Sequence, residues 1–65
     1  MRNHRIYCAV RSESDTGRPW VDFSTAASVE WLAADRADKA DRAIPHWGAA
    51  NPVIRVQRFT LTPED

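Results

Sequence analysis

The stretch RIYCAVR, residues 5–11, has the pattern of a β-strand with apolar side chains on both faces. Successive side chains of a strand point to opposite sides, so Ile6, Cys8 and Val10 share one face and Tyr7 lies on the other. A strand that is apolar on both faces suits the centre of a sheet. We therefore expect residues 5–11 to form the central strand.

A polar segment, residues 12–18, separates this strand from a second apolar run. Its Asp15-Thr16-Gly17 triplet is typical of a turn, because Asp and Gly favour tight backbone turns. Trp20–Phe23 then predicts a shorter second strand. Pro19 before it and Asp22 within it favour an edge position, because edge strands tolerate proline and charge. Two strands joined by a short loop pair antiparallel.

A helix is expected next, from residue 26 to about residue 44, with Ser24 or Thr25 as its N-cap. Pro45 ends the regular helix, because proline lacks the N–H that would bond to the preceding turn. Residues 46–50 have room for one further short helical turn. The helix spans ~30 Å, which is enough to cross a small sheet.

Residues 53–61 predict a third strand. Its apolar residues change parity after Val56, and a β-bulge near Gln57 or Arg58 would account for the change. The order strand, strand, helix, strand predicts one α+β domain over residues 1–65 with a ββαβ topology. We expect a three-stranded antiparallel or mixed sheet of order 2-1-3, with the helix packed on one face.

The predicted helix is apolar on two sides when its residues are placed at 100° intervals. Trp31 points to the side opposite the main apolar stripe, with Ala27 and Ala34 beside it. Arg36 falls inside the stripe, where it would either extend its charge to solvent or pair with Asp22. The stripe assigned to the sheet consists of Val29, Leu32, Ala33, Ala40, Ala43 and Ile44.

The environment of Trp31 has two interpretations. Either the helix bends, or the segment around residues 51–52 folds back, and the indole is covered within the chain. Alternatively Trp31, with Ala27 and Ala34, belongs to a surface that binds a partner or a second copy, because tryptophan is enriched at binding hot spots.

A second candidate surface is the sheet face away from the helix. If the helix covers the even-numbered residues of the first strand, then Arg5, Tyr7 and Arg11 face outward. Arg55 of the third strand then lies near them, and Trp20 joins from the edge. Arginine beside aromatic rings on an open sheet is how several modules stack single-stranded bases. Binding of a nucleotide or nucleic acid is therefore an alternative to a hydrated face, or to one that packs on a second copy.

Catalytic and metal chemistry find little support in the sequence. The Asp15-Thr16-Gly17 triplet matches that of aspartic proteases, but a polar segment precedes it here and the chain is too short for such an enzyme. Cys8, with His4 or His46, has the residue types of a nucleophile or metal site. However, Cys8 lies on an apolar strand face, and no second cysteine accompanies it. We expect a non-enzymatic protein without a cofactor or metal, in which Cys8 is part of the core.

The composition of the chain bears on its partners, its location and its oligomeric state. Nine basic and nine acidic residues give no net charge, which disfavours nonspecific binding to nucleic acid. The aspartates and cations that alternate along residues 35–42 predict a solvated helix face. No apolar run is long enough to span a membrane, and a lone cysteine suits the reducing cytoplasm. A chain of 65 residues buries a marginal core, so we expect a homodimer.

The segments Ile44-Pro45-His46-Trp47 and Asn51-Pro52-Val53-Ile54-Arg55-Val56 resemble small uncharacterised proteins of phages and prophages in GC-rich bacteria. In those proteins a strand pair, an alanine-rich helix and a final strand make up the whole chain. The resemblance implies an inhibitor or modulator of a host protein, of the anti-CRISPR or other anti-defence type, that acts by occluding a surface.

Overall fold

The computed structural model describes residues 4–61 of the chain, which form three strands and two helices. β1 pairs antiparallel with both β2 and β3, so the sheet has the order β2-β1-β3. The predicted α+β fold, with its ββαβ layout and strand order 2-1-3, is confirmed. The elements are β1 (His4–Ser12), β2 (Pro19–Ala27), α1 (Glu30–Ala43), α2 (Pro45–Ala50) and β3 (Val53–Leu61).

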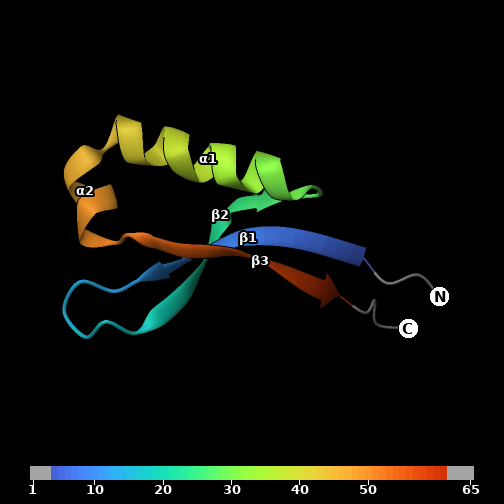
Figure 1. Cartoon of the computed structure of the whole chain (residues 1–65), viewed down its shortest axis with the longest axis horizontal. Helices are drawn as coiled ribbons and strands as arrows, with labels where there is room; N and C mark the ends of the chain where they lie inside the picture. Colours follow the sequence, from blue (N-terminus) through green and yellow to red (C-terminus); the bar gives the residue numbers. More distant parts are fainter. Residues whose placement is uncertain (1–3, 62–65) are drawn as a thin grey trace.

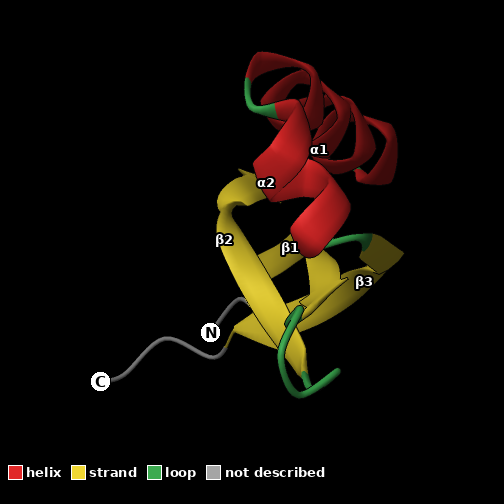
Figure 2. Cartoon of the chain, turned by 90° about the vertical axis from the view of Figure 1, so that its left-hand side faces the viewer, coloured by secondary structure: helices red, strands yellow, loops and turns green. Residues whose placement is uncertain are grey.

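The molecule has two layers. α1 runs above the sheet from the far end of β2 toward α2, which brings the chain back to the start of β3 (Figure 1). Both helices lie on the same side of the sheet, and the other side carries no helix (Figure 2). The expected Asp15-Thr16-Gly17 turn joins β1 to β2, with Gly17 at a φ of 70°. Glycine adopts that left-handed backbone region without strain.

The face of β1 that packs on the helices is the reverse of the one predicted. The Arg11 side chain hydrogen-bonds to Asp41 of α1, so it lies on the helix side. Because side chains alternate along a strand, Ala9 and Tyr7 share that side, and Cys8 lies on the side without helices. The prediction failed because it placed the charged arginine outside, whereas the fold buries it and gives its Nε and Nη1 hydrogen-bond partners, with Nη2 buried and unpaired among the described residues.

β2 is longer than predicted, and the helix begins later. Asp22 pairs with Ala9 and Ala27 pairs with Tyr7, so the four residues between Asp22 and Ala27 form a wide bulge. The Thr25 hydroxyl accepts the Ala9 N–H at 2.8 Å and donates to the Asp22 carbonyl at 2.6 Å. The predicted helix cap was therefore wrong, because this hydroxyl fills a gap in the sheet ladder.

α1 begins after Val29, whose extended backbone provides no side-chain cap. Glu30 in the first turn suits the positive end of the helix dipole. The helix ends before Ile44 because the residue preceding a proline is disfavoured in the α conformation. Pro45 then occupies the first turn of α2, a position where a missing N–H costs nothing.

The bulge of β3 lies earlier than the predicted position near Gln57 or Arg58. Val10 pairs with Arg55, and Arg11 pairs with Val53, which leaves Ile54 as the extra residue. From Arg55 onward the pairing with β1 is regular. The parity change after Val56 is therefore not a bulge: Val56 pairs with Ala9 on the helix side, and Phe59 pairs with Ile6 on the other side, so the strand carries apolar residues on both faces.

The buried side of α1 is centred on Ala33 and Ala37. Ala37 was not in the predicted stripe, whereas Val29 is 40% exposed and Ile44 49% exposed. Arg36 is exposed and donates a hydrogen bond to the Ala26 carbonyl, so it does not pair with Asp22. Two alanines on the buried side allow the helix backbone to approach the sheet closely.

The core is built from small side chains. Within the part of the chain described, no leucine, isoleucine, phenylalanine or tryptophan is classed as buried. Six larger apolar side chains are exposed instead, among them Phe23, Trp31 and Ile54. Of the fully buried side chains, Arg11 is the largest. The buried apolar residues are Cys8, Ala9, Val10, Ala27, Ala33 and Ala37.

Candidate functional site

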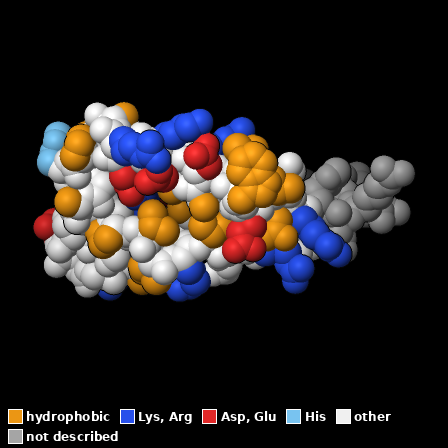
Figure 3. Space-filling view, turned by 45° about the horizontal axis from the view of Figure 1, so that its top comes forward, with side chains coloured by type: hydrophobic (Ala, Val, Ile, Leu, Met, Phe, Trp, Pro, Cys, Tyr) orange, Lys and Arg blue, Asp and Glu red, His pale blue; other side chains and the backbone are white. Residues whose placement is uncertain are grey.

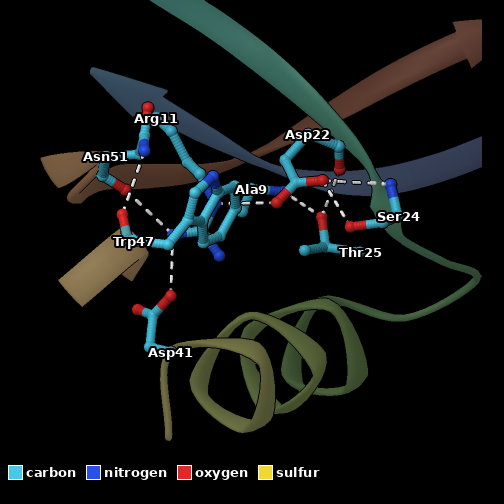
Figure 4. Close-up of polar contacts among 8 residues, drawn as sticks. All are labelled: Ala9, Arg11, Asp22, Ser24, Thr25, Asp41, Trp47 and Asn51. Carbon is cyan, nitrogen blue, oxygen red and sulfur yellow. Dashed lines mark hydrogen bonds and ion pairs between the residues drawn. The ribbon is translucent and has the colours of Figure 1, made fainter. Parts of the chain in front are cut away.

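Arg11 lies at the centre of a polar cluster between the sheet and the helices (Figure 4). Its side chain has no exposed surface. Nε donates to Asp22 Oδ2 at 2.7 Å, and Nη1 donates to Asp41 Oδ1 at 2.9 Å. Nη1 also donates to the carbonyl of Asn51, the residue that caps α2, at 2.9 Å. One guanidinium thus connects β1, β2, α1 and the end of α2. We call Arg11, Asp22, Asp41, Trp47 and Asn51 the Arg11 cluster.

Two tryptophans complete the surroundings of the guanidinium. Arg11 Cζ lies 4.6 Å from the centre of the Trp47 ring, a cation–π contact that strengthens away from water. Trp20 meets Trp47 edge to face, with ring centres 6.3 Å apart. Trp47 is half-buried. These contacts fix α2 over the end of β1.

Asp22 is held in the ionised form. Burial alone would raise the pKa of its carboxyl, but hydrogen bonds from Ser24 and Arg11 outweigh burial and lower the pKa below the ordinary value of 3.8. Asp22 is only 5% exposed. The pair therefore carries opposite charges within the core, where removal of one partner strands the other.

Asp41 reaches Arg11 because α2 leaves space for it. Gly48 of α2 is buried, and a Cβ built there would lie 2.8 Å from Asp41 Cγ. Contacts that short do not occur between carbon atoms, so a side chain at Gly48 would displace the carboxylate. Asp41 was predicted to belong to a solvated helix face. That prediction holds for the exposed pairs Asp35–Lys39 and Asp38–Arg42, but not for Asp41.

The Arg11 cluster has the chemistry of a structural support. Each carboxylate accepts from the guanidinium, and the Cys8 thiol has a raised pKa because of its burial and the nearby Asp22 charge. Cys8 is buried, as expected, and a protonated thiol is a poor nucleophile. His46 is exposed on α2, and the side chain of His4 lies outside the described residues. Among the described residues, no group of three potential metal ligands lies together.

Trp31 is an exposed large apolar side chain of α1, with 70% of its surface accessible. Ala34 lies three residues on, along the same side of the helix, and is also exposed. Ala27, which was expected beside them, is instead buried in β2 opposite Tyr7. Figure 3 turns α1 toward the viewer and shows apolar groups between clusters of acidic and basic side chains.

A groove separates α1 from β3 on the side of the helix that carries Ala34. It encloses about 210 Å³ and combines apolar side chains with two aspartates. β3 pairs only with β1, so its outer edge has no backbone partner among residues 4–61. Arg55, Arg58 and the bulge at Ile54 are features that edge strands use to discourage pairing. The groove is lined by Ala34, Ala37, Asp38, Asp41, Val53 and Val56.

The structure does not bring Arg5, Tyr7, Trp20 and Arg55 to one surface. Arg5 and Tyr7 share the helix side of β1 with Arg11, by strand alternation. Trp20 is half-buried against Trp47. Arg55 pairs with Val10, so it lies on the side without helices. Trp20 and Arg55 do line one hollow, but Arg5 and Tyr7 lie on the other side of the sheet, so the aromatic and basic surface predicted for stacking of bases does not form as a whole.

Sequence reasoning missed Arg11 as a core residue and Asp41 as its partner. The available signal was the position of Trp20 and Asp22, which alternate in β2 and flank the end of β1. A carboxylate and an aromatic ring on one strand face indicate a cation on the neighbouring strand. Asp41 gave no such signal, because the sequence does not show that α2 folds back beside it.

No protein-family model, curated protein or solved structure matches this chain. No helix in residues 4–61 is both long enough and apolar enough to cross a membrane.

Proposed function

We propose that the chain is a non-catalytic protein-binding inhibitor or modulator that acts by covering a surface of another protein. The observation that carries the proposal is the exposure of Trp31, at 70%, on the side of α1 that borders the groove toward β3. A large aromatic side chain in water is unfavourable alone, and it contributes strongly to binding when a partner covers it.

Side-chain contact is favoured over addition of a strand to β3. The edge of β3 carries two arginines and a bulge, which oppose backbone pairing with an arbitrary strand. The groove is small, and its apolar walls suit one or two inserted side chains of a target. Trp31 and Ala34 then contact the target beside that insertion.

That the target is a host protein is proposed from the resemblance to phage proteins. The anti-defence, anti-CRISPR-like role and the cytoplasmic location are proposed on the same basis. Such a role needs only a stable surface, because a stoichiometric inhibitor acts by occupying its target. The Arg11 cluster keeps that surface in one shape, because its hydrogen bonds hold α1 and the end of α2 in a single arrangement on the sheet.

Capture experiments with two matched variants test the proposal. Trp31 and Phe23 are almost equally exposed, at 70% and 71%, so replacing either with alanine should leave the fold intact. The tagged wild-type chain and the tagged Phe23→Ala variant should capture the same protein from the lysate of a bacterium with a GC-rich genome. The Trp31→Ala variant should capture at least ~30-fold less of that protein, as expected when a binding hot spot is lost. Equal capture by both variants, or loss with Phe23→Ala alone, would contradict the proposal.

Binding of single-stranded nucleic acid is the second candidate. Its remaining support is Arg55 near Phe59 on the side of the sheet without helices, where an aromatic ring and a cation could receive a base. Titration with short single-stranded oligonucleotides at several salt concentrations tests it. Affinity that falls steeply with salt favours this candidate over the first.

A further inference from the structure

We infer that the acidic segment that follows β3 binds a cationic pocket of the same chain, beside the start of α1. The segment contains Glu64 and Asp65, two of the chain's nine acidic residues, and no basic residue. The pocket encloses about 380 Å³ and is lined by Arg5 of β1 and Arg36 of α1, so we call it the Arg5–Arg36 pocket. It shares no lining residue with the groove between α1 and β3, so the inference is independent of the proposed function.

The Arg5–Arg36 pocket forms where β2 leaves the sheet. β2 ends at Ala27, which pairs with Tyr7, so the start of β1 has no strand beside it on that edge within residues 4–61. The first turns of α1 lie next to this gap and bring Leu32 and Arg36 to it. The apolar part of the lining consists of Ile6, Ala26, Ala27 and Leu32. The pocket therefore combines an apolar lining with arginines from two elements.

The positive charge of the pocket has no counter-charge in the described part of the chain. No acidic residue lines the pocket. Within residues 4–61 neither Arg5 nor Arg36 has an ion-pair partner, whereas Lys39 and Arg42 of α1 each pair with an aspartate. Arg36 donates a hydrogen bond to the Ala26 carbonyl, which holds its guanidinium at the pocket. The two arginines thus favour an anionic occupant.

The start of α1 adds to this preference. Its first backbone N–H groups receive no side-chain cap, so the positive end of the helix dipole is open to an anion. Ser28 and Leu32, which flank this end of the helix, both line the pocket. Glu30 in the same turn is exposed and does not line it. The helix end therefore reinforces the charge of the two arginines.

The acidic segment starts close to the pocket. Leu61, the last residue of β3, pairs with His4, and Thr60 pairs with Arg5. The start of α1, the start of β1 and the end of β3 lie at the same end of the molecule (Figure 1). Four extended residues span about 13 Å, whereas the outer strands of a three-stranded sheet lie about 10 Å apart. The carboxylates of the segment can therefore reach the pocket across the end of β1.

Arg58 is the competing cation for the segment. It pairs with Tyr7, so it lies on the helix side of β3, and it is exposed. A single solvated arginine holds a carboxylate weakly, because water screens an exposed ion pair. The pocket offers two arginines and the end of α1, and its apolar lining suits the ring of Pro63. The combined charge and lining favour the pocket over Arg58.

Nuclear magnetic resonance of the full chain tests the inference through the backbone order parameters of Glu64 and Asp65. In the wild type at low salt they should exceed about 0.6, the value below which a backbone is flexible. Arg5→Gln and Arg36→Gln should each lower them, because each removes one cation of the pocket. Salt at about 1 M should lower them as well, because it screens charges beyond about 3 Å.

Arg58→Gln is the matched control, because it removes an exposed arginine on the helix side of the sheet but outside the pocket. It should leave both order parameters unchanged, and far-UV circular dichroism should show that every variant remains folded. Order parameters below about 0.6 in the wild type at low salt would overturn the inference. So would a fall with Arg58→Gln as large as that with Arg36→Gln.

Reversal of the charges provides a second test. Arg5→Glu combined with Arg36→Glu should release the segment, because the pocket then repels both carboxylates. Adding Glu64→Arg and Asp65→Arg to that variant should restore the order of the segment, because the attraction is rebuilt with opposite signs. A folded charge-reversed chain in which the segment stays flexible would contradict the inference.

Discussion

At the scale of the residue, Arg11 takes the place that a large hydrophobic side chain has in most cores. A buried ion pair adds little net stability compared with apolar packing, because desolvation offsets the attraction. Its value here is geometric, since Asp22 and Asp41 accept from different nitrogens of the same guanidinium. A misplaced helix would leave a buried charge without a partner, so the cluster selects a single packing of helices on sheet.

The lowered pKa of Asp22 predicts a specific loss of stability in acid. The folded pKa lies below the ordinary 3.8, so the carboxylate contributes stability above that value. The contribution is lost as the pH falls through the folded pKa, because the unfolded chain then binds the proton more readily. Urea unfolding from pH 6 downward should show stability falling below about pH 4.

Asp22→Asn is the control for this titration, since the amide keeps the size of the carboxyl but carries no charge. The variant should be less stable at neutral pH because Arg11 loses an ionic partner. Its stability should also change less than that of the wild type as the pH falls. An identical acid dependence in both proteins would show that Asp22 does not titrate as described.

At the scale of the element, the packing of α2 on α1 depends on Gly48. Gly48→Ala should lower the free energy of unfolding by about 1–3 kcal/mol, because the new methyl group overlaps Asp41 and pushes it from Arg11. Alanine is the better helix former, so intrinsic propensity alone predicts the opposite sign. Chemical denaturation distinguishes the two effects.

Asp41→Ala removes the carboxylate from this contact but keeps the Cβ, which lies 2.9 Å from a Cβ built at Gly48. Gly48→Ala should therefore cost less there than in the wild type, because no carboxylate remains to be pushed from Arg11, and the two substitutions should be non-additive. Ala49→Ser, at an exposed position of α2, should change stability by no more than about 0.5 kcal/mol. Additive effects of the Gly48 and Asp41 changes would mean that these residues do not touch.

The elements themselves were largely predictable, whereas their faces were not. β1 and β3 show strong strand patterns, and the short loop after β1 dictates an antiparallel hairpin, so the strand order followed. The extension of β2 was not predictable, because Ser24 and Thr25 have the composition of a helix cap. Thr25 instead replaces a backbone group in the sheet ladder, a role visible only once Ala9 lies opposite.

At the scale of the whole molecule, the chain buries small side chains and leaves large ones on its surface. The helical periodicity placed Trp31 opposite the main apolar stripe but left open whether the chain covers it, and its 70% exposure agrees with the second of the two interpretations. The surface predicted for Arg5, Tyr7, Trp20 and Arg55 did not form, because β1 faces the helices with the side that carries Arg11. Because side chains alternate along a strand, reversing the face of β1 moves each of its residues to the opposite side of the sheet.

The most direct test of this account compares the stabilities of Trp31→Ala and Trp47→Ala at low protein concentration. The indole of Trp31 lies in water, whereas that of Trp47 packs against Arg11 and Trp20. Trp31→Ala should therefore change the free energy of unfolding by less than about 1 kcal/mol, and Trp47→Ala should lower it by roughly 2–4 kcal/mol. If Trp31→Ala unfolds the protein and Trp47→Ala does not, α1 faces the other way and the arginine-centred core is wrong.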